Sequence, residues 1–290
     1  MTDAGSGGRK AWRYSISEVT TFDCTFEEDV DLYEAAGCAG IGVWGFKMER
    51  VGSDRAKELL KRHGLRAANC IPELNSIMPY ALSPTPEDPM KRVEAFLTNM
   101  ERMARLDPET IVVITGPRGE RSVEEATDLC LKGFERIGKA AKDLGVTVAL
   151  EPIHKSARND LSLIWDLPGA LRMLKQINQP SFKILFDTWH LWDTAEVKTL
   201  LAENIDLIGG VHVADWRTDT RTWMDRAFPG EGKTRVGDLV IALDRAGFKG
   251  LYDVEIFSDN GQFLSKFPDS LWALPSKDIV QRATRIFAEI

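Results

Sequence analysis

The amino-acid sequence predicts an α/β protein, a single-domain (β/α)₈ barrel. Eight short apolar segments alternate with eight helix-like segments, and this alternation implies parallel strands. No linker or change in composition divides the 290 residues, and eight strand–helix units close into a barrel of about 250 residues. The rival fold, an open doubly wound sheet, would carry a Gly-rich phosphate turn after the first strand, where this chain has TTFDCTFEED.

The first half of the chain contains four of these units. We expect residues 1–10 to form a flexible N-terminal tail and residues 11–290 to form the barrel. Apolar runs predict strands over 13–20, 40–46, 65–71 and 111–116. Helices are expected from Thr25 to Gly37 and Gly40, from Ser53 to Gly64, from about residue 89 to Arg105, and from Ser122 to Gly145. Capping and acidic side chains suit the helix starts, and glycine suits the left-handed residue that ends a helix.

The second half contains the other four units, and each of its apolar runs ends on a potential metal ligand. The runs cover 146–151, 182–187, 206–212 and 251–255, and they end on Glu151, Asp187, His212 and Glu255. Helices are expected after Leu167, after Asp193, over 237–246 and from about Ser276. In barrels of this kind the active site lies at the C-terminal ends of the strands, where all four side chains would converge.

Composition excludes several other classes of protein. Hydrophobic residues make up 43% and charged residues 28% of the chain, which predicts a buried core rather than disorder. A net charge of −7 argues against a nucleic-acid partner, because phosphate binding relies on clustered Lys and Arg. Four scattered cysteines without a CxxC pair, no secretion signal and no apolar run of about 20 residues predict a cytoplasmic protein that binds no membrane.

The four strand-end side chains predict a metal site. Taken singly, an acidic residue after a strand can also cap the next helix. Three carboxylates and an imidazole meeting at one point would repel one another unless a cation or protons held them together. This oxygen-rich set favours Mn²⁺ or Mg²⁺, and Co²⁺ or Zn²⁺ could substitute for them.

Five motifs resemble the sugar phosphate isomerase/epimerase superfamily, which consists of xylose isomerase-like TIM barrels. They are EPIH at 151–154, FDTWH at 186–190, GVHVADWR at 210–217, PGEG at 229–232 and DVEIF at 253–257. The resemblance implies one Mn²⁺, Mg²⁺ or Co²⁺ ion held by Glu151, Asp187, His212 and Glu255. It also implies that His190 and Arg217 contact a small-molecule sugar. The superfamily commonly forms homo-oligomers, and whether a small second subunit is needed stays open.

One branch of the superfamily, the apurinic endonucleases, is excluded by the histidine count. Those enzymes bind three metals through extra histidines on earlier strands, whereas this chain has only His63, His154, His190 and His212. His63 lies in KRHG at a predicted helix end, where a cation stabilises the helix dipole.

The resemblance implies a metal-dependent sugar isomerase or epimerase that works through a metal-stabilised enediolate. Glu151 and Glu255 would remove and return the α-proton. Ala157 stands where ketose epimerases carry a substrate-binding Glu, and His154 is either a general base or a loop residue. The alternative is therefore a lyase that uses the same enediolate, such as a keto-inositol dehydratase or the catalytic subunit of a C-glycoside deglycosidase acting on a 3-keto-glycoside. A non-catalytic binding barrel is a third hypothesis, which metal content would test.

Residues near the predicted barrel mouth also bear on the substrate. Trp44, Trp189, Trp216 and Phe257 lie at or near strand ends, where an aromatic ring either packs in the core or stacks on a sugar. The segment over 215–232 has the length and mixed composition of a lid. Within it, Glu231 is a candidate substrate contact, although the PGEG turn alone accounts for the neighbouring glycines.

Overall fold

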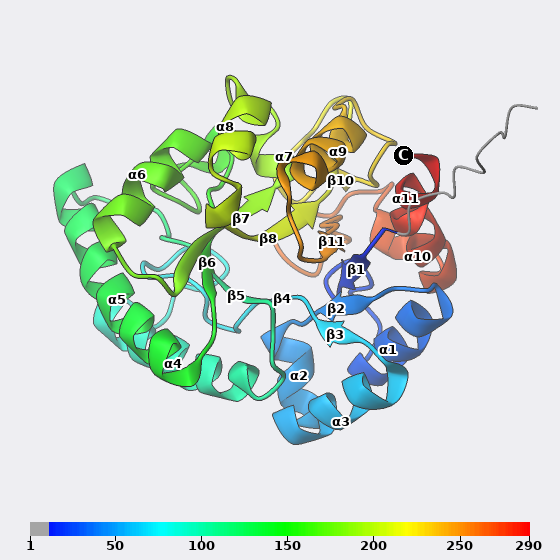
Figure 1. The fold of residues 1–290 in the computed structure, drawn as a ribbon, viewed down its shortest axis with the longest axis horizontal. Coiled ribbons are helices and arrows are strands. Elements are labelled where there is room, and N and C mark those ends of the chain that lie inside the picture. Colours follow the sequence, from blue (N-terminus) through cyan, green and yellow to red (C-terminus); the bar gives the residue numbers. More distant parts are fainter. Residues whose placement is uncertain (1–11) are drawn as a thin grey trace, which may run out of the picture.

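Parallel strands form a ring at the centre of the molecule, and helices surround it (Figure 1). The computed structural model describes residues 12–290, so the tail expected over residues 1–10 lies outside the described part. The strands of the ring are β1 (Tyr14–Ser17), β2 (Gly40–Gly42), β3 (Arg66–Ala67), β4 (Asn69–Cys70), β5 (Thr110–Val113), β6 (Val148–Leu150), β7 (Phe182–Asp187), β8 (Ile208–Val213) and β11 (Tyr252–Val254). A separate antiparallel pair is formed by β9 (Asp215–Trp216) and β10 (Arg226–Ala227).

The ring closes because β3 and β4 are two pieces of one strand. Only Ala68 separates them, and β3 pairs with β2 whereas β4 pairs with β5. The remaining order is β2-β1-β11-β8-β7-β6-β5. The first and last strands of the ring, β1 and β11, pair with each other, with Tyr14 opposite Tyr252. Within residues 12–290 the ring therefore has eight strand positions, and the predicted (β/α)₈ barrel is confirmed.

The helices follow the predicted alternation closely. They are α1 (Phe26–Ala35), α2 (Gly45–Val51), α3 (Ser53–His63), α4 (Pro89–Ala104), α5 (Val123–Leu144), α6 (Leu167–Ile177), α7 (Thr188–Leu191), α8 (Val197–Glu203), α9 (Val236–Ala246), α10 (Ser276–Thr284) and α11 (Ile286–Glu289). Thr25 and Ser122 cap α1 and α5 through complete capping boxes, as their sequence positions predict. Within the described residues, no helix combines the length and apolar character needed to cross a membrane.

Two sequence predictions near β2 were wrong. The strand expected over 40–46 ends at Gly42, and the unexpected helix α2 begins at Gly45. Gly45 lies against the backbone at Glu73, where a Cβ atom would come within 2.5 Å of the Glu73 amide nitrogen. Gly40 begins β2 and does not end α1, because α1 already stops at Ala35 and Gly37 takes the left-handed conformation with φ of 74°.

Side chains of the strands alternate between two environments. Val211, Val213, Tyr252 and Val254 belong to the large apolar core, which is packed mainly by the surrounding helices. The residues between them, His212 and Asp253, therefore point toward the inside of the ring. This alternation places polar side chains from neighbouring strands in the barrel interior.

Candidate metal centre

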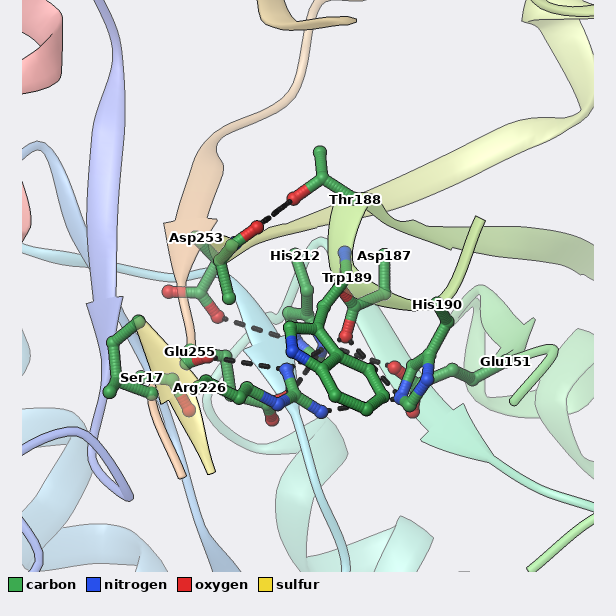
Figure 2. Close-up of polar contacts among 12 residues, drawn as sticks. Ser17, Glu151, Asp187, Thr188, Trp189, His190, His212, Arg226, Asp253 and Glu255 are labelled. Carbon is green, nitrogen blue, oxygen red and sulfur yellow. Dashed lines mark hydrogen bonds and ion pairs between the residues drawn. The ribbon is translucent and has the colours of Figure 1, made fainter. Parts of the chain in front are cut away.

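Glu151, Asp187, His212 and Glu255 meet at the C-terminal ends of four adjacent strands (Figure 2). Glu151 follows β6, Asp187 ends β7, His212 lies in β8 and Glu255 follows β11. One ligand atom from each residue lies within 4.8 Å of the other three, and all four residues are buried. The sequence-predicted convergence is therefore present, and these four residues could hold one metal ion.

The imidazole of His212 lies at the centre of this group. Its Nδ1 is 3.3 Å from Glu151 Oε1 and 3.3 Å from Glu255 Oε2. Its Nε2 is buried without a hydrogen-bond partner, and the Asp253 carboxylate lies 3.7 Å from it. A carboxylate on that side favours the tautomer with the proton on Nε2, which leaves the Nδ1 lone pair facing the two glutamates. A cation placed among these three acceptors would relieve their repulsion.

Burial makes the carboxylates of the group costly to ionise. Desolvation raises the pKa of Glu151 well above its ordinary value, and the charge of Asp187 raises it further. Desolvation also raises the pKa of Glu255 to about 7. Desolvation acts in the same direction on Asp187, but the charges of Arg226, His190 and His212 outweigh it and lower the pKa of that carboxyl.

A buried arginine, Arg226, accompanies the group, and we did not identify it from the sequence. Its Nη1 donates to Asp187 Oδ2 at 2.9 Å, to Glu255 Oε2 at 3.1 Å and to the Glu255 carbonyl at 3.2 Å. The guanidinium also lies 5.3 Å from the ring centre of Trp189 and 5.0 Å from that of Phe257. In the sequence it lies in the mixed segment over 215–232 that predicts a lid, directly after Asp225, and nothing there marks it as buried.

The charges of the site fit a divalent cation. If all three carboxylates are ionised, Arg226 balances one of them and two negative charges remain. A carboxylate-rich donor set with one imidazole suits Mn²⁺ or Mg²⁺ by its chemistry. The Asp253 carboxylate lies 3.7 Å from His212 Nε2, on the side where ligating histidines normally have a carboxylate partner, and the sequence did not predict this role.

His190 lies beside Arg226 and is held in one orientation. Its Nδ1 accepts a hydrogen bond from the backbone amide of His154 at 3.0 Å, which assigns the proton of the neutral ring to Nε2. Burial lowers the pKa of His190 to about 3, so the ring is neutral near pH 7. The Nε2 lies 3.2 Å from Arg226 Nη2 and 3.6 Å from Asp187 Oδ2. Since arginine only donates, two donors lie next to each other beside this carboxylate.

The His154 ring points away from the group. It packs edge-on against Trp216, with ring centres 4.7 Å apart, and its Nε2 lies 3.4 Å from Asp193 Oδ2. Its Nδ1 accepts from the amide of Ser156 at 3.2 Å. The structure therefore brings the His154 backbone to the site, through His190, but not the imidazole that a general base requires.

Arg217 and Glu231 are not brought to the site. Arg217 pairs with Asp225 at 3.1 Å and with Asp269 at 2.6 Å, in the segment that follows β9. Glu231 forms ion pairs with Arg282 of α10 and with Arg285, which lies between α10 and α11. We accordingly leave both out of the candidate site, because their charged groups are engaged elsewhere.

A cavity of about 650 Å³ reaches two of the four potential metal ligands, Glu151 and Glu255, and we call it the inner cavity. Glu151, His190, Arg226 and Glu255 line its polar end. Trp44, predicted as a substrate contact, lines the apolar part, with its ring centre 5.7 Å from that of Phe257. A concave, mainly apolar pocket with a few converging polar groups is the usual form of a small-molecule site.

Fold and site together define a (β/α)₈ barrel with four potential metal ligands at its C-terminal mouth. Residues 30–289 match the family described as the xylose isomerase-like TIM barrel. The chain belongs to this family, and the resemblance to the sugar phosphate isomerase/epimerase superfamily is confirmed.

The individual relatives described next share less than 25% of their residues with this chain. A ketose 3-epimerase from Arthrobacter globiformis is 24% identical over 213 residues, which cover 71% of this chain and 68% of that protein. The crystal structure of the IolI protein with a bound zinc atom aligns over 96% of this chain and 97% of its own, with a TM-score of 0.77 and 18% identity. The 3-keto-D-glucoside 4-epimerase YcjR from E. coli aligns over 96% of this chain and 100% of its own, with a TM-score of 0.72 and 17% identity. The two structures show the same fold.

Proposed function

We propose that the protein is a divalent-metal-dependent sugar isomerase or epimerase that acts by abstracting a proton next to a carbonyl. The observation that carries this proposal is the convergence of four buried donor atoms within 4.8 Å at the polar end of the inner cavity. The ketose 3-epimerase relative supports the choice of reaction and of a sugar as substrate.

We assign the proton transfer to two carboxylates. When bound, a divalent cation would act as a Lewis acid on the substrate carbonyl and its neighbouring hydroxyl. Glu151 and Glu255 both line the inner cavity. One carboxylate removes the α-proton, which leaves an enediolate, and the other returns a proton. Return to the other face of the same carbon gives epimerisation, whereas return to the adjacent carbon gives isomerisation.

We assign the binding of a substrate oxygen to His190 and Arg226. The Nε2–H of His190 and the Nη2 of Arg226 are two donors only 3.2 Å apart, and both residues line the inner cavity. A carbonyl or enediolate oxygen that accepts from both would remove the unfavourable contact between them. Because both donors are fixed by buried neighbours, they stabilise developing negative charge without reorganising.

A lyase is the second candidate, and one position favours it. Ala157, where ketose epimerases carry a substrate-binding Glu, lies in a short 3₁₀ helix (Lys155–Ala157) and is buried. It packs with Ile114, Ile153 and Leu161, so this position supplies no carboxylate to a substrate. The same enediolate can expel a substituent from the neighbouring carbon, so a keto-inositol dehydratase or a 3-keto-glycoside lyase would use the same residues.

Three further features belong to the proposal. Manganese is the native metal we propose, from the donor chemistry. We propose that the protein acts in the cytoplasm on small sugar-derived molecules. This holds for the isomerase and for the alternative lyase, which would break a carbon–oxygen or a carbon–carbon bond. We propose a homo-oligomer, with a small second subunit as the alternative.

The test follows the α-proton. Protein treated with chelator and then reloaded with Mn²⁺ is incubated in D₂O with ketoses, keto-inositols and 3-keto-glycosides, and products and deuterium incorporation are read by NMR. We expect turnover with exchange only in the reloaded protein, and loss of both in Glu151→Gln and Glu255→Gln. Full activity after chelation, or in either Gln variant, would refute the proposal. A rearranged sugar identifies an isomerase or epimerase, and an eliminated substituent identifies a lyase.

A further inference from the structure

The inner cavity is larger than a single sugar needs. A hexose has twelve non-hydrogen atoms, and even at the roughly 30 Å³ that a water molecule occupies in the liquid they would fill about 360 Å³. The inner cavity measures about 650 Å³. On the order of 300 Å³ therefore remains once a hexose lies at the metal-ligating end. This space is part of the same pocket and can hold a substituent on the sugar.

The rest of the inner cavity is mainly aromatic and apolar. Trp44, Trp223 and Phe257 line it, and the ring centre of Phe257 lies 5.7 Å from Trp44 and 5.5 Å from Trp223. Trp44 and Trp223 are half-buried, so part of each ring is open to a ligand. Aromatic faces bind aromatic or alicyclic groups through apolar burial and ring stacking. A free hexose at the polar end would leave this part of the wall unused.

A second cavity of about 620 Å³, which we call the outer cavity, adjoins the inner one. Tyr80, Leu82, Leu161 and Trp223 line both cavities, and we call these four residues the shared wall. The shared wall is apolar apart from the Tyr80 hydroxyl and the Trp223 indole N–H.

Charge argues against a phosphorylated sugar. Among the described residues that line the inner cavity, Arg226 is the only permanent cation, and it is engaged by Asp187 and Glu255. Arg221 is the only cation among the described residues of the outer cavity, and it pairs with Asp225 and Asp269. Glu73 adds a carboxylate to the inner rim. An anionic group on the substrate would therefore lack a free partner and would be repelled at the rim.

We propose that the substrate is a sugar bearing an uncharged aromatic or other apolar substituent, with the sugar at the metal-ligating end and the substituent against Trp44, Trp223 and Phe257. The choice of a sugar rests on the proposed function, whereas the substituent rests on the cavity. The 3-keto-glucoside named for the YcjR structure is a sugar of the substituted kind and supports the same direction.

The test measures binding and needs no turnover. Phenyl β-D-glucoside and methyl β-D-glucoside are titrated into Mn²⁺-loaded protein by calorimetry, with glucose 6-phosphate as the anionic comparison. Burying about 100 Å² more apolar surface corresponds to roughly 50-fold in affinity, so we expect the phenyl glucoside to bind about 10- to 100-fold more tightly than the methyl glucoside. Glucose 6-phosphate should bind no better than the methyl glucoside.

Variants locate the preference. Trp223→Ala should reduce it to less than about threefold, because the extra apolar contact is lost. Leu82→Gln, a smaller change in the shared wall, should reduce it in the same direction. Trp165→Ala is the matched control, since Trp165 is 42% exposed and lines neither cavity. It should leave the preference unchanged.

The outcomes separate this inference from the proposed function. The substituted-sugar inference is overturned if the two glucosides bind with equal affinity or if neither binds detectably. It is also overturned if both Trp223→Ala and Leu82→Gln keep the full preference for the phenyl glucoside, or if glucose 6-phosphate binds more tightly than the methyl glucoside. Turnover of free ketoses without the preference would do the same while leaving the proposed function intact. A clear phenyl preference in a protein that exchanges no α-proton with any sugar would support the cavity inference and contradict the proposed reaction.

Discussion

Replacing Asp253 by asparagine tests whether the four potential ligands bind a cation with the help of Asp253. Asp253 is fully buried, accepts a hydrogen bond from Ser15 Oγ at 2.7 Å and lies 3.7 Å from His212 Nε2. Asparagine keeps the size and can still accept from Ser15, but it removes the charge that favours the Nε2–H tautomer of His212. The change therefore acts on the metal-ligating Nδ1 without touching a ligand.

The expected loss follows from the distance. Two full charges 3.7 Å apart interact by about 4.5 kcal/mol at an effective dielectric constant of about 20. The N–H of a neutral ring carries only part of a charge, so the contribution must be smaller. Loss of such an outer partner typically lowers metal affinity by about 10- to 100-fold. That range corresponds to about 1.4 to 2.8 kcal/mol, which lies below the full-charge value.

The assay is a Mn²⁺ titration of chelator-treated protein by calorimetry at pH 7.5, with thermal unfolding as a check that Asp253→Asn is folded. Ser15→Ala is the matched control, because it removes the hydrogen bond to Asp253 and keeps the charge. We expect the Ser15→Ala dissociation constant to change by less than about threefold. A folded Asp253→Asn protein that binds Mn²⁺ as tightly as the parent would refute the reasoning.

Three further predictions concern the same group. Arg226→Met should lower the free energy of unfolding of the metal-free protein by about 3 to 5 kcal/mol, because buried carboxylates lose their partner. In denaturant unfolding, Mn²⁺ should restore part of the lost stability. An unchanged unfolding midpoint in the metal-free variant would contradict the assigned ion pairs. His154→Ala should lower kcat less than tenfold, since its ring points away from the cavity, whereas a loss above about a hundredfold would restore it as a base. Burial raises the pKa of Asp253 and Glu255 to about 7 from 3.8 and 4.5, so the stability they contribute below pH 4 is lost as pH rises toward 7. The melting temperature of chelated protein should fall between pH 5 and pH 7.5 and recover with Mn²⁺, and a flat or rising profile without metal would contradict this.

Local signals accounted for most of the fold. Thr25, Ser122 and Gly145 marked helix ends correctly, because capping depends on residues within one turn. The helix from Gly45 was missed because its start depends on close packing against Glu73, a residue distant in sequence. The split third strand was missed for a related reason, since its two pieces pair with different neighbours.

The candidate site divides in the same way. Glu151, Asp187, His212 and Glu255 could be found from the sequence because each ends an apolar run, and parallel strands bring such ends together. Arg226 and Asp253 could not be recognised, since their importance comes from which side chains they face across the barrel. Arg217 matched a motif, but its ion pairs with Asp225 and Asp269 hold it elsewhere.

Strand periodicity and helix capping are short-range properties, and for this reason the sequence by itself determined the (β/α)₈ barrel, its four potential ligands and their common end. The side chain that neutralises the carboxylates, the direction of the His154 ring, and the size and apolar character of the cavity were decided only by the tertiary structure. They depend on contacts between segments far apart in the chain, whose energies arise only when the closed ring excludes water from the groups it brings together.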